Sequence, residues 1–131
     1  MLLRMATVEV TEKNFEETIE KGLVLLDWWA EWCGPCRRFA PIYEEASGRH
    51  ADVVFGKVDT EAQPNLAGEF GIRSIPTIMA FREGILLFAQ PGSLPGEVLD
   101  ELIGKLREVD MDEVRRRVAE AREAAAAQDE K

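Results

Sequence analysis

The chain has 131 residues, of which 46% are hydrophobic and 31% are charged, a composition typical of one globular domain. Its 25 acidic residues outnumber its 16 basic residues and give a formal net charge of −9. This charge excludes binding to nucleic acid or to an anionic membrane through the overall field, and no apolar run reaches the length of about 18 residues that spans a bilayer.

The N-terminal sequence MLLRMATVEV has no apolar stretch of the length found in secretory signals, so we expect a cytoplasmic protein. Either Met1 or Met5 could be the first residue. The chain has two cysteines, Cys33 and Cys36. In a reducing compartment we expect them to be metal ligands or redox catalysts rather than a structural disulfide.

The first half of the chain predicts strands that alternate with helices. Residues 6–10 alternate in polarity and predict a strand, which is followed by a helix that Thr11 caps and that ends near residue 21. Residues 23–28 form an almost continuous apolar run, typical of a strand that is buried on both faces. Residues 34–50 have helical periodicity, and Pro41 is expected to kink this helix.

The second half predicts a short helix over 64–70 and a longer one that begins near Ser93 and Pro95. Apolar runs bounded by turn residues predict three further strands, at 53–58, 77–81 and 85–89. We expect the last two strands to form an antiparallel hairpin, joined by the three-residue loop Arg82–Gly84 with a bulge at the glycine.

This order of elements predicts an α/β fold, with a central mixed five-stranded sheet flanked by helices. Right-handed crossovers would make the early strands parallel. In such sheets, sites form where the C-terminal ends of strands meet the N-terminal ends of helices. The segment WWAEWCGPC, residues 28–36, lies at such a junction and contains every tryptophan and cysteine of the chain.

The cysteine pair in this segment allows three interpretations. As half of a zinc site, Cys33 and Cys36 would need two further ligands, but the chain has a single histidine, His50, and no third cysteine, so we predict no metal site. A second interpretation is that both cysteines are inert core residues. We favour the third, redox chemistry, because inert cysteines seldom lie at a helix start a few positions after a strand.

The redox interpretation explains the spacing of the pair. A C-x-x-C turn at a helix N-terminus brings both sulfurs to bonding distance, and the unpaired N–H groups of the helix favour a thiolate at Cys33. Cys33 is therefore the predicted nucleophile, and Cys36, about one turn further, is the thiol that resolves a mixed disulfide. Pro35 suits the first helical turn, where its missing N–H is not needed.

Asp27 interrupts the apolar strand six residues before Cys33. Burial of a carboxylate raises its pKa, so Asp27 is a candidate proton acceptor and donor for Cys36. The alternative is an aspartate at a strand end that reaches solvent. Lys57, near the end of the third strand, is either a charge beside Asp27 or an ordinary solvated lysine. Pro76 precedes a strand, and general frequencies favour a trans bond there.

Taken together, these residues resemble the thioredoxin family. The similarity covers residues 6 to about 107 in order, and a C-terminal helical extension follows. It rests on these matching segments: Asp27–Cys36, Ala40-Pro41, Lys57-Val58-Asp59, Gly71–Thr77, Phe81–Gly84 and Gly92. The resemblance implies a thioredoxin fold and a protein disulfide reductase, an enzyme that carries electrons through a dithiol–disulfide cycle.

The resemblance also assigns expected roles. Cys33 would attack the substrate disulfide, Cys36 would release the reduced product, and Asp27 would assist Cys36 with Lys57 close by. It implies a cis bond at Pro76, against the general frequency. An apolar substrate-binding surface would be formed by Trp32, Gly34, Pro35, Ile75, Pro76 and Gly92, with Trp29 and Pro41 as structural support.

The Gly-Pro pair between the cysteines is typical of the reducing members of the family. Electrons would come from a separate thioredoxin reductase, a flavin-containing and NADPH-dependent enzyme, so the chain is expected to bind no cofactor beyond the Cys33–Cys36 disulfide. Its other partners would be disulfide-containing client proteins, with no nucleic acid and no membrane, and we expect a monomer. The alternative function is a client-binding or chaperone module in which redox chemistry is secondary.

Residues 1–107 are predicted to form the thioredoxin domain, and 108–131 a charged amphipathic helical extension. Asp110 or Asp112 could cap this helix. Its apolar stripe is narrow and spans about two heptads, fewer than a coiled coil needs. The helix could pack on its own domain, pair with another chain or stay solvated; we favour the first and the third because its alanine-rich face buries little area.

Overall fold

The computed structural model of the protein describes residues 6–129. The choice between Met1 and Met5 as the first residue lies outside these residues, as do the outer ends of the two predicted segments 1–107 and 108–131. The elements, in chain order, are β1 (Thr7–Glu9), α1 (Phe15–Ile19), β2 (Leu23–Trp29), α2 (Gly34–Arg49), β3 (Val54–Asp59), α3 (Pro64–Glu69), β4 (Thr77–Arg82), β5 (Ile85–Pro91), α4 (Gly96–Arg107) and α5 (Met111–Asp129).

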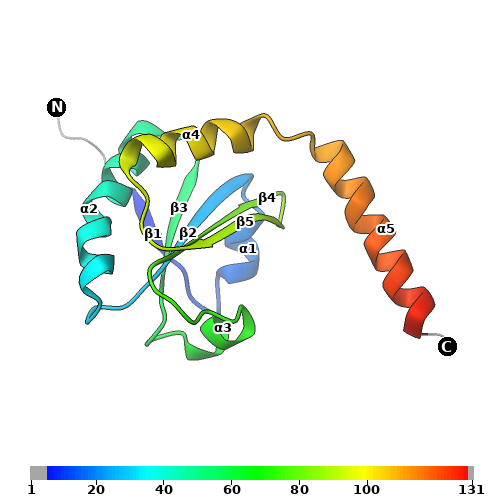
Figure 1. Ribbon diagram of the computed structural model, residues 1–131, viewed down its shortest axis with the longest axis horizontal. Helices are drawn as coiled ribbons and strands as arrows, with labels where there is room; N and C mark the ends of the chain where they lie inside the picture. The colour runs from blue at the N-terminus through cyan, green and yellow to red at the C-terminus, as the bar shows by residue number, and fades with distance from the viewer. Residues whose placement is uncertain (1–5, 130–131) are drawn as a thin grey trace.

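The five strands form one mixed sheet in the order β1-β3-β2-β4-β5. β1, β3 and β2 are parallel, whereas β4 and β5 are antiparallel to their neighbours. Helices α2 and α4 cover one face of the sheet, and α1 and α3 lie on the other, as Figure 1 shows. The predicted fold class, a five-stranded mixed sheet flanked by helices with an additional C-terminal helix, is confirmed.

β2 is the central strand, and its side chains are buried on both sides of the sheet. Leu25 points into the core beneath α2 and α4, whereas Val24, Leu26 and Trp28 point into the core beneath α1 and α3. All four are fully buried. The continuous apolar run at 23–28 therefore reflects burial from two directions, as expected of a strand inside a sheet covered on both faces.

The predicted cap of the first helix is wrong. α1 begins at Phe15 rather than after Thr11, because the side chain of Asn14 organises a turn before the helix. Its Oδ1 accepts a hydrogen bond from the Thr11 backbone N–H at 2.8 Å, and its Nδ2 donates to the Glu9 carbonyl at 3.0 Å. This turn uses the residues that the sequence pattern assigned to the first helical turn.

The hairpin between β4 and β5 also differs from its prediction. Arg82 pairs directly with Ile85, so the loop has two residues instead of three. Both of these residues have positive φ, 54° at Glu83 and 78° at Gly84, as the tight hairpin turn requires. The bulge lies further along the hairpin, where the register shifts between Ala80 and Phe81.

α5 extends away from the sheet beyond a short connection after α4, as Figure 1 shows. Only Met111 is buried in this helix. Asp110, one of the two candidate caps, accepts hydrogen bonds from the backbone N–H groups of Asp112 at 3.1 Å and Glu113 at 3.2 Å. Of the three interpretations of this helix, the structure supports a largely solvated one that is attached at its first turns.

Two arginines make this attachment. The Nη1 atom of Arg82 in β4 donates to the carbonyls of Leu106, Arg107 and Val109, at 3.0, 3.3 and 3.1 Å, and so closes the C-terminal end of α4. Arg115 of α5 donates to both carboxylate oxygens of Glu83 at 2.6 Å. Within residues 6–129, none of the helices is both long enough and apolar enough to cross a membrane.

The small buried area of α5 predicts that most of this helix contributes little to stability. We expect deletion of residues 112–131 to lower the free energy of unfolding only slightly, because residues 112–129 are exposed or half-buried and exposed ion pairs such as Arg115–Glu83 contribute little. Met111→Ala should cost more, about 2 kcal/mol, because it empties a buried site. Urea denaturation of both variants checks this; a truncation that costs more than Met111→Ala would show that α5 packs on the domain.

Candidate active site

The two cysteines lie where β2 passes into α2. Cys33 is the N-cap residue of α2, with an extended backbone (φ −87°, ψ 112°), and its Sγ accepts a hydrogen bond from the Cys36 backbone N–H at 3.2 Å. Pro35 occupies the first turn, as its missing N–H allows. The Cα atoms of Cys33 and Cys36 are 5.2 Å apart and a disulfide joins their sulfurs. The helix N-terminus thus directs N–H groups and its positive dipole end at Cys33.

The loop before β4 forms a second wall of the site. The Ile75–Pro76 peptide bond is cis, which confirms the expectation from the family resemblance and not the general frequency. The Cys33 Sγ lies 3.7 Å from the Ile75 carbonyl oxygen, and Ile75 packs against the cluster formed by Ala30 and the two cysteines. Gly92 follows β5 with φ 101°, and its N–H donates to the Pro76 carbonyl at 2.8 Å.

The disulfide is largely covered by these two walls. Cys33 is 4% exposed and Cys36 is 2% exposed, so the difference in burial between them is small. The surface beside it is more open: Pro35 and Gly92 are exposed, and Gly34 and Ile75 are half-buried. The disulfide is therefore most accessible from this edge.

Trp32 is the most exposed large apolar side chain at this edge, at 68%. Its Nε1–H donates to the Glu61 carboxylate at 2.7 Å, and this contact holds the indole against the segment after β3. Sequence reasoning missed Glu61, because a residue 29 positions from Trp32 gives no local signal. Trp29 is half-buried, packs against the cysteine cluster, and has the Lys57 Nζ 4.8 Å from its ring centre.

Asp27 is fully buried in β2, so the alternative that it reaches solvent is wrong. It pairs in register with Lys57 of β3 and Ile78 of β4. Neither of its carboxylate oxygens has a hydrogen-bond partner among the described residues. Burial raises the pKa of Asp27 from 3.8 to about 7, and the positive charge of Lys57 opposes that rise.

Tyr43 of α2 is a further polar group in this core. Its side chain is fully buried, and its Oη donates to the Gly56 carbonyl at 2.8 Å, one residue before Lys57. Burial raises the pKa of Tyr43 well above its ordinary value, and the nearby Asp27 charge adds to this effect. The helical periodicity placed position 43 in the core, but it gave no sign that its hydroxyl would lie near Asp27.

The remaining predicted residue, Pro41, lies inside α2, which continues past it to Arg49. Pro41 is exposed and is separated from Cys36 by more than one turn of the helix. Across residues 6–129, no three His, Cys, Asp or Glu side chains are grouped so that they could hold a metal ion.

Comparisons with known proteins agree with this geometry. The family model described as "Thioredoxin" matches residues 6–108. A relative from Streptomyces coelicolor, "Putative thioredoxin 2", is 58% identical over 116 residues, which cover 88% of this chain and 87% of that protein. A "Thioredoxin" from Staphylococcus haemolyticus is 41% identical over 104 residues, which cover 77% and 98%. The crystal structure of a Malassezia sympodialis thioredoxin superposes with a TM-score of 0.71 at 29% identity and covers 79% of this chain and 94% of that one.

The raised pKa of Asp27 predicts that stability falls as pH rises. The folded protein holds this proton up to about pH 7, whereas the unfolded chain releases it near pH 3.8. The contribution of Asp27 to stability is therefore fully present below about pH 3.8 and is lost as pH rises through about 7. At 1.36 kcal/mol per pKa unit, the loss is on the order of 4 kcal/mol. Asp27→Asn should flatten this slope in urea denaturation of the oxidised protein between pH 5 and pH 8.

The matched control is Asp52→Asn, which removes an exposed carboxylate whose pKa is lowered by a hydrogen bond from Arg107. Asp52 is already ionised at pH 5, so this variant should keep the wild-type slope. A wild-type stability that stays constant from pH 5 to pH 8 would contradict the prediction.

Proposed function

Since the chain belongs to the thioredoxin family and is a protein disulfide reductase, we propose that Cys33 attacks the client disulfide and that Cys36 resolves the mixed disulfide. The observation that carries this assignment is the position of Cys33 as N-cap of α2, with its Sγ already accepting the Cys36 N–H. A thiolate at Cys33 gains this hydrogen bond and the favourable end of the helix dipole.

The reaction moves two electrons to the client in two exchanges. The Cys33 thiolate attacks one client sulfur, the client S–S bond breaks, and the departing client thiolate takes up a proton. The Cys36 thiolate then attacks the Cys33 sulfur, which releases the second client thiolate and forms the Cys33–Cys36 disulfide. The reduced client leaves, and the protein is left in the oxidised state that the structure contains.

In this mechanism, Asp27 accepts the proton of the Cys36 thiol before the second exchange. A carboxyl group with a pKa of about 7 is divided between its two forms near neutral pH, which suits both acceptance and return of a proton. The charge of Lys57 favours the ionised form of Asp27 and so raises the fraction of Asp27 that can accept a proton.

The client would lie across the two walls of the site. In this proposal the Ile75 backbone pairs with an extended client segment, which is supported by the distance of 3.7 Å between its carbonyl oxygen and the Cys33 sulfur. In this proposal Trp29 supports the cysteine loop, since it packs against the cluster that contains both cysteines, and Pro41 lies further along α2. The proposed contact surface comprises Trp32, Gly34, Pro35, Ile75 and Gly92, whereas Pro76, the remaining predicted member, is buried in the second wall.

Membership of the family implies two kinds of partner, a reductase and disulfide-containing clients. For this chain we propose a flavin-containing, NADPH-dependent reductase as the electron source, a monomeric state, a cytoplasmic location and no bound cofactor beyond the disulfide. The Gly-Pro pair between the cysteines supports the reducing direction. A client-binding module without redox chemistry is not favoured, because binding alone would not require two thiols at bonding distance.

Substitution of either cysteine should abolish catalysis of insulin disulfide reduction with dithiothreitol as electron donor. Cys33→Ser removes the attacking sulfur, whereas Cys36→Ser leaves the attack intact but blocks resolution. The Cys36→Ser protein should therefore accumulate a mixed disulfide with its client through Cys33, detectable by mass spectrometry as an adduct that a reductant removes.

Ser47→Ala, a change in α2 far from the disulfide, serves as a control and should keep wild-type turnover. Adducts of Cys33→Ser in place of Cys36→Ser would reverse the two assignments. Binding of unreduced insulin that survives both cysteine substitutions unchanged would favour the client-binding module.

A further inference from the structure

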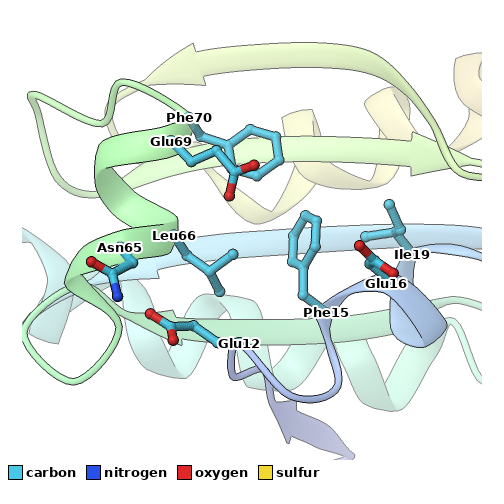
Figure 2. A pocket seen from close by; sticks show the side chains of 8 residues that line it. All are labelled: Glu12, Phe15, Glu16, Ile19, Asn65, Leu66, Glu69 and Phe70. Carbon is cyan, nitrogen blue, oxygen red and sulfur yellow. The ribbon is translucent and has the colours of Figure 1, made fainter.

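A pocket of about 430 Å³ opens between α1 and α3, in a region that the proposed redox mechanism does not use. Figure 2 shows its walls: α1 and the turn before it on one side, and α3 with the residue that ends it on the other. The lining residues are Glu12, Phe15, Glu16, Ile19, Asn65, Leu66, Glu69 and Phe70.

The floor of the pocket is aromatic and firmly packed. The rings of Phe15 and Phe70 are 5.1 Å apart and tilted by 54°, and both contact Phe81 of β4 at 6.0 and 6.3 Å. Phe70 also lies 5.6 Å from the buried Trp28 ring of β2. The sheet supports these rings. Phe15 and Leu66 are buried and Phe70 is half-buried, so Phe70 offers most of the aromatic surface to the pocket.

The rim of the pocket is negatively charged. The carboxylates of Glu12, Glu16 and Glu69 lie on different sides of the Phe15 ring in Figure 2. Every charged residue of the lining is a glutamate, and all three are exposed. Among residues 6–129, the ion pairs within 4.0 Å involve none of them.

Helix electrostatics account for only part of this arrangement. Glu16 lies in the first turn of α1, where a negative charge is favourable. Glu69 is the last residue of α3, at the end where a helix favours positive charge. A carboxylate there, directly before an aromatic floor residue, is instead complementary to a cation that enters the pocket.

We propose that this pocket binds an arginine side chain of a partner protein. A guanidinium group is planar, stacks on aromatic faces and donates to carboxylates in pairs, and its aliphatic stem would lie against Leu66 and Ile19. The aromatic floor matches the stacking of the guanidinium group, and the carboxylate rim matches its paired hydrogen-bond donors. A purely apolar partner segment would leave three carboxylates without compensation.

The position of the pocket connects it to the client-binding edge. Phe15 and Leu66 belong to a buried apolar cluster against which Phe70, Ile72 and Ile75 pack. The segment from α3 to Pro76 therefore has the pocket at its beginning and the second wall of the active site at its end. The pocket lining contains no cysteine, so binding there involves no thiol chemistry.

The test is a titration of the oxidised, uniformly ¹⁵N-labelled full chain with the peptide acetyl-Gly-Arg-Gly-amide at low salt, followed by amide chemical shifts. The matched peptide contains citrulline, which keeps the shape of arginine but lacks its charge. We expect shifts at residues 12–19 and 65–70, and binding that is about fivefold weaker with citrulline or in 0.5 M NaCl.

Two sets of variants locate the effect. The triple variant Glu12→Gln, Glu16→Gln and Glu69→Gln should weaken arginine binding about fivefold, and Phe70→Leu should weaken it while retaining apolar volume. The control triple variant Glu97→Gln, Glu108→Gln and Glu123→Gln makes the same change in net charge at exposed sites elsewhere and should bind as the wild type does.

Equal binding of the citrulline peptide, equal weakening by the control variant, or shifts outside the two segments would each overturn the proposal. Folding of every variant is checked by its amide spectrum. Because Cys33→Ser should leave this titration unchanged, loss of disulfide reduction and loss of arginine binding are separately observable.

Discussion

The structure depends on one constraint, which is the burial of β2 from Val24 to Trp28 between two layers of helices. Side chains of this strand alternate between the two cores, and one of the buried positions is Asp27. Neither oxygen of this carboxyl group is hydrogen-bonded within the described chain. Its burial raises its pKa to about 7, so the group titrates near neutral pH. The stability that the central strand contributes thus offsets the cost of burying a carboxyl group that can become charged.

The same strand also positions the disulfide. β2 ends at Trp29, and a short loop leads to Cys33 at the N-terminus of α2, so one connection supplies both the sulfur and the helix end that favours its thiolate. The opposite wall comes from the loop before β4. Strand β4 pairs with β2 in antiparallel register. Because both walls are attached to the same central strand, residues more than 40 positions apart meet at the cysteines.

Much of this arrangement could be predicted from the sequence, because the strongest patterns are also the most constrained. The buried run of β2 and the helix after Cys33 follow from periodicity and composition, whereas burial of Asp27 was one of two alternatives that the pattern left open. Features that depend on side chains meeting in space could not be predicted in this way. The Asn14 turn displaces the expected Thr11 cap, and Glu61 reaches Trp32 from a distant segment.

The cis bond before Pro76 is a further example, since the local sequence favoured trans and only the family resemblance indicated otherwise. The hydroxyl of Tyr43 is another, because a helical pattern identifies a buried position but not the polar group that shares its core. The hairpin turn was misjudged by one residue, since Glu83 adopts positive φ together with Gly84.

The central claim is that the fold keeps Asp27 as a group that gains and loses its proton near neutral pH. The most direct measurement is a ¹³C NMR titration of the Asp27 carboxyl carbon in the oxidised protein, assigned by comparison with Asp27→Asn. The account predicts a midpoint at about pH 7 for this carbon. A midpoint near 3.8, the ordinary value for aspartate, would contradict it.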